Sequence, residues 1–332
     1  MSDLQNLLTD VAGVSVGHAT DLALGSGVTA IVFDAPATAS GSVLGGAPGG
    51  RDTDLLDPSR TVSQVDAFVL SGGSAFGLDA AGGVQAGLRQ AGRGFRVGNV
   101  LVPIVPQAIL MDLLNGGNKD WGLHSPYRDL GYAAFEAASG GPFALGTVGA
   151  GTGVTTANLK GGLGSASART SRGAVIAAIA AVNAMGSAVV GDGPHFWAAP
   201  FEQDGEFGGL GLPSSFHTAM RIKGMTTTAT TIAAIVTDAA LIKAEAHRLS
   251  IAAHDGLARA LSCAHLPLDG DTVFAASTAR QPLAGPEEFM ELCHIAGQVM
   301  ARAIARGVYE ATALPYAGAL PAWRDQFADL RP

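Results

Sequence analysis

The chain has too few cysteines and too little clustered positive charge for several common classes of protein. Only Cys263 and Cys293 occur among its 332 residues, and they form neither a Cys-x-x-Cys pair nor part of a Cys/His cluster. A disulfide framework and a structural zinc site are therefore excluded, and we expect reduced thiols. The formal net charge is −8 and no run of lysine or arginine occurs, which argues against nucleic acid and anionic membranes as partners.

Long apolar runs and cofactor motifs are missing as well. No uncharged span approaches about 18 strongly apolar residues without a glycine, and the first residues do not form a basic stretch followed by an apolar one. We therefore expect a cytoplasmic protein. The histidines have no His-x-x-x-His or His-Glu-x-x-His spacing, and no complete phosphate-binding glycine motif is present. Neither a metal nor an organic cofactor is expected.

What the chain has in excess is glycine. It contains 46 glycines, 48% apolar residues and only 6% aromatic residues. This composition predicts a globular protein in which tight turns and close backbone contacts replace bulky side chains. The length allows one large core or two modest ones. We expect a protein whose core has so few bulky side chains to form an oligomer.

Local patterns in the first two thirds of the chain predict strands separated by glycine-rich loops. Residues 28–34 predict a β-branched strand, and residues 37–58 a connection without regular structure. Residues 65–70 predict a strand that is followed by a tight turn, SGGSAF, and a helix. The apolar run at 173–186 predicts a buried strand, and residues 191–228, which lack periodicity, an exposed linker or processing loop.

The last third is predicted to alternate strand, helix, strand and helix. The four elements are expected at 232–236 as a central strand, 243–263, 273–278, and from Pro286 onward. The helix at 243–263 is amphipathic, and its polar face is expected to carry His247 and His254.

Thr230 is the residue that could carry nucleophilic chemistry. A threonine hydroxyl is a weak nucleophile, but at a chain terminus its own α-amine, with a pKa near 8, can accept the proton. An internal threonine must first attack the preceding carbonyl, and Ala229-Thr230 stands where a loop meets a strand, as that step requires. The purely structural alternative is that the run TTTATT only forms the start of a strand, where threonine is favoured. Because the threonines repeat, Thr228 and Thr231 are alternative candidates for the nucleophile.

Four other residues could assist such a threonine. Asp269 and Asp271 stand two apart, so that in an extended segment both carboxylates project to one face and could orient an α-ammonium group. A capped Asp-Gly turn explains them equally well. Asn183 ends an apolar run and could donate to an oxyanion, or it could be a turn residue. Lys160 could stabilise negative charge, although most lone lysines are solvated.

Several segments, in the same order, resemble the DmpA family of L-aminopeptidase/D-esterases. The resemblance extends over nearly the whole chain. Within the family, the segments resemble most the nylon-oligomer hydrolases, which are endo-type aminohexanoate-oligomer hydrolases. The segments that carry it are VAGVSVGHAT, GGAPGGRDTDLL, LSGGSAFGLDAAGGV, TVGAGTG, LKGGLGSAS, AVN, TTIAAIVTD and LDGDTVFAAST.

The resemblance implies a fold, a processing step and a set of catalytic residues. The implied fold is a four-layered α/β/β/α sandwich like those of DmpA and the ornithine acetyltransferases. One catalytic domain, 1–332, would cut itself into subunits 1–229 and 230–332, and these α/β heterodimers would assemble further. The implied nucleophile is Thr230, the oxyanion asparagine Asn183, and the polar pair beside the nucleophile Asp269 and Asp271. Lys160 is a looser match.

Three departures from the family pattern bear on processing and specificity. Ala229 stands where the nylon hydrolases have asparagine, although the chemistry uses only its carbonyl group. Gln107 stands where many aminopeptidase members carry a glutamate for the substrate's amine, and Met111 lies near a tyrosine position. A neutral Gln107 would remove a charge-assisted contact of about 1.5–3 kcal/mol, so the sequence favours an amidase or endo-type hydrolase over a strict aminopeptidase.

Two other functions remain open at the level of sequence. An acyltransferase like the ornithine acetyltransferases would share threonine self-cleavage but pass the acyl group to an amine. An unprocessed homologue would only bind small amides in a glycine-lined cleft. The natural substrate and the stoichiometry of assembly are not predicted.

Overall fold

The computed structural model describes residues 4–224 and 229–327. Its helices are α1 Ala80–Gln90, α2 Tyr127–Glu136, α3 Lys243–Ala260, α4 Pro286–Tyr309 and α5 Trp323–Gln326, with short 3-10 turns η1 Leu8–Asp10, η2 Thr53–Leu56, η3 Ser74–Asp79, η4 Gly149–Gly151 and η5 Ala199–Phe201. Its strands are β1 Val14–Asp21, β2 Ser26–Val43, β3 Gly50–Arg51, β4 Gln64–Ser71, β5 Phe95–Val97, β6 Val100–Val102, β7 Gln107–Ile109, β8 Leu163–Arg169, β9 Val175–Asn183, β10 Thr230–Ala239 and β11 Thr272–Gln281.

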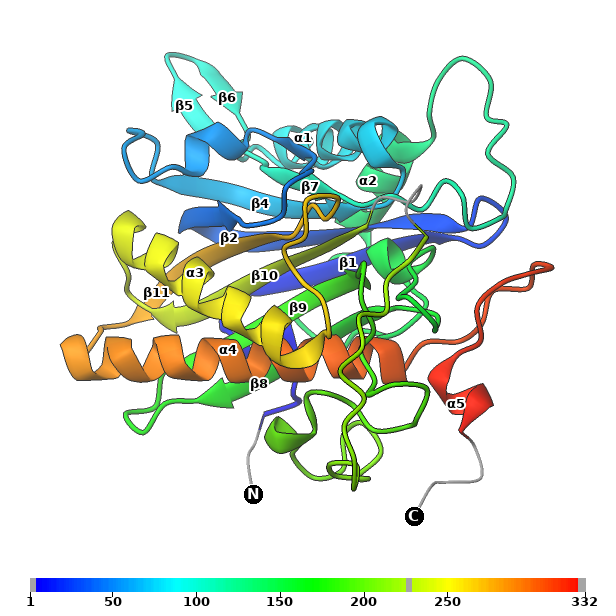
Figure 1. Cartoon of the computed structure of the whole chain (residues 1–332). Coiled ribbons are helices and arrows are strands. Elements are labelled where there is room, and N and C mark those ends of the chain that lie inside the picture. Colours follow the sequence, from blue (N-terminus) through cyan, green and yellow to red (C-terminus); the bar gives the residue numbers. More distant parts are fainter. Residues whose placement is uncertain (1–3, 225–228, 328–332) are drawn as a thin grey trace.

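The strands form two layers that are continuous through the long strand β2. Within the described residues the sheet has the order β3-β7-β4-β2-β11-β10-β9-β8, with β1 paired to β2, and β5 and β6 form a separate hairpin. Helices α1 and α2 cover one face of this arrangement, and α3 and α4 cover the opposite face (Figure 1). The predicted four-layered α/β/β/α sandwich is confirmed.

Alternating side chains on the strands separate three apolar cores. On β10, Ala233 and Ile235 belong to the core beneath α3 and α4, while Ile232 and Val236 face the core between the two strand layers. The third core lies between α1 and α2 and the strands β1, β2 and β4. Because β10 is buried on both faces, it reads as a nearly continuous apolar run, which is why the sequence identifies it as a central strand.

The prediction that residues 37–58 have no regular structure is wrong for 37–43, and the rest contains the short elements β3 and η2. Strand β2 continues to Val43 and changes partner on the way, pairing with β4 at its start and with β11 at its end. The extension consists of small residues, which look like a loop in the sequence. At Gly41 the space is tight, because a Cβ atom there would lie 3.1 Å from the ring of Phe274.

Most other elements agree with the predictions, with two corrections. The segment at 191–224 has no long element, but Phe196 and Phe207 are buried in a core, so it is not simply an exposed linker. His254 does not lie on a solvated helix face: it is 2% exposed and its Nε2 atom is 3.1 Å from the carbonyl oxygen of Ser42. His247, about two helical turns earlier, contacts the carbonyl oxygen of Gly41 through its Nδ1 atom at 3.0 Å.

No helix in the described part of the chain has the length and apolar character needed to cross a membrane.

Candidate active site at Thr230

The peptide before Thr230 is held against the loop that precedes β11. Ala229 forms a parallel bridge with Asp269, and its amide nitrogen donates to the carbonyl oxygen of Leu268 at 3.2 Å. The amide nitrogen of Gly270 donates to the carbonyl oxygen of Ala229 at 3.0 Å. The carbonyl carbon of Ala229 is therefore polarised by a fixed backbone donor, and Ala229 itself is fully buried.

The hydroxyl of Thr230 lies on this same peptide. Its Oγ1 atom is 2.5 Å from the carbonyl oxygen of Ala229 and donates to it. The space for the hydroxyl exists because residue 270 is a glycine: a Cβ atom there would lie 2.7 Å from Oγ1 of Thr230. Thr230 is 5% exposed, so water has little access to this contact in the uncut chain.

The other threonines of the run do not share this arrangement. The hydroxyl of Thr231 is buried and has no hydrogen-bond partner among the described residues. Thr228 lies outside the described residues. Thr230 is also the position that pairs with Asn183 in the register of β10 and β9, so the strand pairing brings two predicted site residues together.

Asn183 is a buried strand-end amide with a fixed orientation. It is 1% exposed, its Nδ2 atom donates to the carbonyl oxygen of Met111 at 2.9 Å, and its Oδ1 atom accepts from the amide of Thr155 at 3.1 Å. Lys223 donates to the same Oδ1 atom at 2.9 Å. One N–H of the Asn183 amide is thus left to donate to a reacting oxygen, which supports the oxyanion interpretation over a turn asparagine.

The two predicted aspartates are both buried beside the junction. Asp271 accepts the amide of Thr231 at 2.9 Å with one oxygen, and both the amide and Nδ1 of His265 with the other. Burial and, to a smaller extent, the nearby Asp271 raise the pKa of Asp269 to about 7, against the opposing effect of Lys223. Asp271 thus caps two backbone amides, as the turn alternative predicts, and fixes the start of β10. Asp269 is a buried carboxyl group that titrates near neutral pH.

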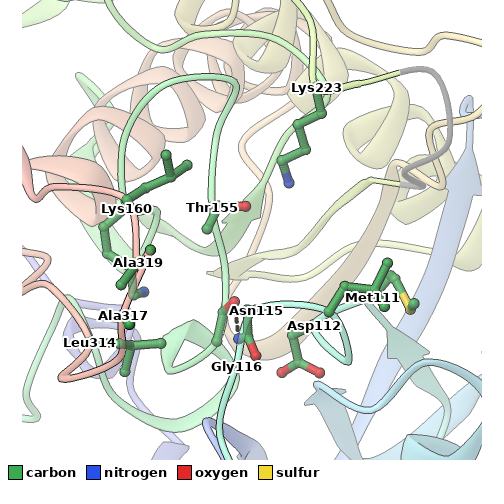
Figure 2. A pocket seen from close by; sticks show the side chains of 14 residues that line it. Met111, Asp112, Asn115, Gly116, Thr155, Lys160, Lys223, Leu314, Ala317 and Ala319 are labelled. Carbon is green, nitrogen blue, oxygen red and sulfur yellow. Dashed lines mark hydrogen bonds between the residues drawn. The ribbon is translucent and has the colours of Figure 1, made fainter.

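A cavity of about 270 Å³ adjoins the site (Figure 2). Two residues of its wall, Met111 and Thr155, are hydrogen-bond partners of Asn183. Figure 2 shows the amine of Lys223 reaching toward Thr155 inside this cavity. The complete lining is Met111, Asp112, Leu114, Asn115, Gly116, Gly153, Thr155, Lys160, Lys223, Leu314, Ala317, Gly318, Ala319 and Leu320.

Lys160 is buried in the cavity wall rather than solvated. Its amine donates to the carbonyl oxygens of Gly151 at 3.0 Å and Gly161 at 2.7 Å. Burial lowers its pKa to about 7, against the opposing effect of Asp112. A lysine in this state is able to exchange a proton near neutral pH.

Three residues near the site were not predicted from the sequence. Lys223 lies in the segment interpreted as a linker, and its only signal is that it is one of four lysines in the chain. His265 contacts Asp271 from a strained backbone with φ of 59°, and nothing in the sequence marks it. Asp112 follows Met111 directly and carries the carboxylate in the cavity wall.

Gln107 does not line the cavity. The argument that its neutral side chain weakens binding of the substrate's amine is therefore not supported. Its side chain is fully buried, its Oε1 atom accepts from the amide of Ala81 at 3.0 Å, and its Nε2 atom donates to the carbonyl oxygen of Gly77 at 2.5 Å. Gln107 therefore anchors the start of α1. Within the described residues, no group of three or more His, Cys, Asp or Glu side chains is placed to bind a metal ion.

Comparison with known proteins agrees with this fold. A model described as Peptidase family S58 matches residues 6–319. An uncharacterized aminopeptidase of Mycobacterium bovis is 42% identical over 354 residues, which cover 97% of this chain and 98% of the relative. A Burkholderia beta-aminopeptidase superposes with a TM-score of 0.72 at 21% identity, covering 100% of this chain and 96% of that one.

A second similar solved structure is described as a variant of a named fold. The L-aminopeptidase D-Ala-esterase/amidase of Ochrobactrum anthropi, described as a prototype for the serine aminopeptidases with a variant of the Ntn hydrolase fold, superposes with a TM-score of 0.70 at 18% identity. The match covers 98% of this chain and 95% of that one. The sandwich described above is thus of the Ntn hydrolase type.

Proposed function

The chain belongs to peptidase family S58, and from this membership we propose that it is a self-processing amide hydrolase whose nucleophile is Thr230. It is a hydrolase of peptide or amide bonds, as its family and its aminopeptidase relatives are. The observation that carries the choice of residue is the 2.5 Å contact between the hydroxyl of Thr230 and the carbonyl oxygen of Ala229. That carbonyl group already accepts the amide of Gly270.

Processing would proceed by attack of Oγ1 of Thr230 on the carbonyl carbon of Ala229. The peptide C–N bond breaks as the C–O bond of an ester forms, and the proton of the hydroxyl passes to the departing nitrogen. Water then hydrolyses the ester, leaving subunits 1–229 and 230–332. The Gly270 amide is the donor that would stabilise the oxyanion of the first step, because it is already directed at the oxygen on which charge develops.

In the cut protein the freed α-amine of Thr230 would act as the base. With a pKa near 8 it accepts the proton of Oγ1 during attack on substrate and returns it to the leaving amine. Asn183, opposite Thr230 in the sheet, would donate to the substrate oxyanion. Asp269 and Asp271 would orient the amine and set its proton affinity, and Lys160 would adjust the charge of the cavity.

The cavity supports a small substrate with an apolar stretch and a cationic end. Asp112 is the acidic side chain of the lining and would have to attract an ammonium group while its oxygens also accept hydrogen bonds from Ser26 and Gly73. Leu114 and Leu314 provide apolar wall. Peptides, β-peptides and aminohexanoate oligomers all offer an amine separated from the amide by carbon atoms. The sequence pattern shared with nylon-oligomer hydrolases favours the longest of these spacings.

We also propose that the heterodimers associate further and that the protein is cytoplasmic. Support for association is the β5–β6 hairpin, on which Phe95 pairs with Val102 and Val97 with Val100, each of the four side chains being 47–58% exposed. A continuous exposed apolar face of this kind fits a contact with another copy. Support for the location is that both cysteines are free.

The test of the proposed function is a time course of intact mass on the purified protein, followed by amide hydrolysis assays. Two fragments, the smaller starting at Thr230, and turnover of alanine, β-alanine or 6-aminohexanoate amides are expected. Thr230→Ala should remain one inactive chain, while the matched control Thr231→Val, which removes an unpartnered hydroxyl, should be cut and active. Cleavage at 229/230 in Thr230→Ala would refute the assignment.

A further inference from the structure

Lys223 contacts the candidate oxyanion residue from the segment that precedes the proposed cut. Its amine donates to Oδ1 of Asn183 at 2.9 Å and to the carbonyl oxygen of Asn183 at 3.2 Å. Its own amide nitrogen donates to the carbonyl oxygen of Met185 at 3.0 Å. One residue therefore holds both the side chain and the backbone of the strand end that faces Thr230.

The position of this amine has a direct effect on the Asn183 amide. A cation that donates to Oδ1 draws electron density from the amide nitrogen, so that the remaining N–H of Nδ2 becomes a stronger donor. The amide of Thr155 acts on the same oxygen in the same direction. The half-buried Lys223 amine also lies one side chain away from the place where substrate charge would develop, and that side chain, Asn183, is 1% exposed, so screening between them is weak.

Lys223 interacts electrostatically with two charged groups near the site, Asp269 and Lys160. Asp269 favours the ammonium form of Lys223, and the positive charge of Lys223 in turn lowers the pKa of Lys160. Burial lowers the pKa of Lys223 to about 7. The strength of its hydrogen bond to Asn183 therefore changes over the range in which the enzyme would work.

We propose that Lys223 is a positioning residue that fixes and polarises Asn183 as the oxyanion donor. This inference rests on the proposed function, because it assigns Lys223 a part in the Thr230 reaction. A lysine that only tied down the segment around residue 223 would not need to direct its amine to the side-chain oxygen of the residue opposite the nucleophile.

The test compares Lys223→Met with Arg221→Met, which removes a charge from the same segment without touching Asn183, since Arg221 pairs with Asp192. We expect Lys223→Met to lower kcat, per mole of free Thr230 terminus, roughly tenfold or more with KM little changed, and to slow self-cleavage in proportion. The loss should stay below the 10²–10³-fold typical of removing an oxyanion donor itself. Equal kcat and equal cleavage rate in the two variants would overturn the inference.

A third variant, Lys223→Arg, keeps the charge and the donor but does not titrate near neutral pH. It should retain most of the wild-type kcat and remove one ionisation near pH 7 from the pH profile. An unchanged profile would overturn the inference, and this readout decides the matter even if Lys223→Met fails to fold. A wild-type chain that neither cuts itself nor hydrolyses amides would instead refute the proposed function, whatever the Lys223 variants do.

Discussion

The amide nitrogen of Gly270 donates to the carbonyl oxygen of Ala229 at 3.0 Å, across a bridge that joins the residue before the candidate nucleophile to the loop before β11. The same glycine leaves the space in which the Thr230 hydroxyl sits. One residue thus provides both the donor for the processing oxyanion and the room for the attacking group.

Gly270→Ala should therefore impair self-cleavage. The new Cβ atom would lie 2.7 Å from Oγ1 of Thr230 and 2.8 Å from the carbonyl oxygen of Ala47. Relieving such an overlap costs about 1–3 kcal/mol, which corresponds to cleavage slower by roughly 5- to 150-fold when Thr230 gives way. Intact-mass time courses measure the rate. Gly224→Ala, where a Cβ atom meets no described residue within 4 Å, is the control, and equal rates for the two variants would contradict the assigned role of Gly270.

Lys160 should make stability depend on pH above neutrality. Its pKa falls from 10.5 in the unfolded chain to about 7 in the folded one because of burial. Between these values the unfolded chain binds the extra proton, so this group's contribution makes stability rise from about pH 7 to pH 10.5. In a Thr230→Ala background, urea midpoints at several pH values should lose part of that rise in Lys160→Met. Arg221→Met should keep it, and an identical slope in both variants would show that folding does not lower the pKa of Lys160.

The Arg302–Glu206 pair should hold the two proposed fragments together. Arg302 donates to both oxygens of Glu206, at 2.5 and 3.1 Å, and to Oδ1 of Asn6 at 2.9 Å. Removing one partner of such a buried pair costs about 3–5 kcal/mol, so Arg302→Met should strongly lower the unfolding midpoint. The exposed pair Arg60–Asp54 is the control, since Arg60→Met should cost less than about 1 kcal/mol. Similar midpoints for both variants would contradict this ranking.

The hairpin face should govern self-association. Val97→Thr combined with Val100→Thr keeps the branched shape of a cross-strand pair but makes its exposed surface polar. We expect a smaller particle by light scattering, with hydrolysis per chain retained if each site is complete within one copy. Leu123→Ser, at a side chain that is 91% exposed elsewhere on the chain, should leave the mass unchanged. An unaltered mass in the hairpin variant would exclude this surface as the contact.

The sequence was sufficient where periodicity is strong. Strands β9 and β10 and helices α3 and α4 follow from runs of apolar residues, and the pairing of Asn183 with Thr230 agrees with the roles that the family resemblance implies for them. The end of β2 could not be predicted, because small residues beneath Phe274 look like a loop until their partner strand is known.

The rest of the site depends on contacts between distant segments without periodicity. Lys223 reaches Asn183 across forty residues of sequence, and His265 reaches Asp271 only through an unusual backbone conformation. At Gln107 the sequence suggested a role that the structure does not support. Its position in the family pattern suggested a contact with the substrate's amine, but its side chain forms hydrogen bonds with backbone groups at and just before the start of α1 and does not line the cavity.

The place of β10 in the sheet has a consequence for how the mature protein would refold. β10 lies between β9, which precedes the proposed cut, and β11, which follows it. The uncut chain forms this arrangement as a single molecule, at a rate that does not depend on concentration. After the cut, β10 and β9 belong to different molecules, and closing the sheet becomes a bimolecular reaction that slows on dilution. Cutting would thus turn a reversible folding equilibrium into an assembly that, once lost, is recovered only at high concentration.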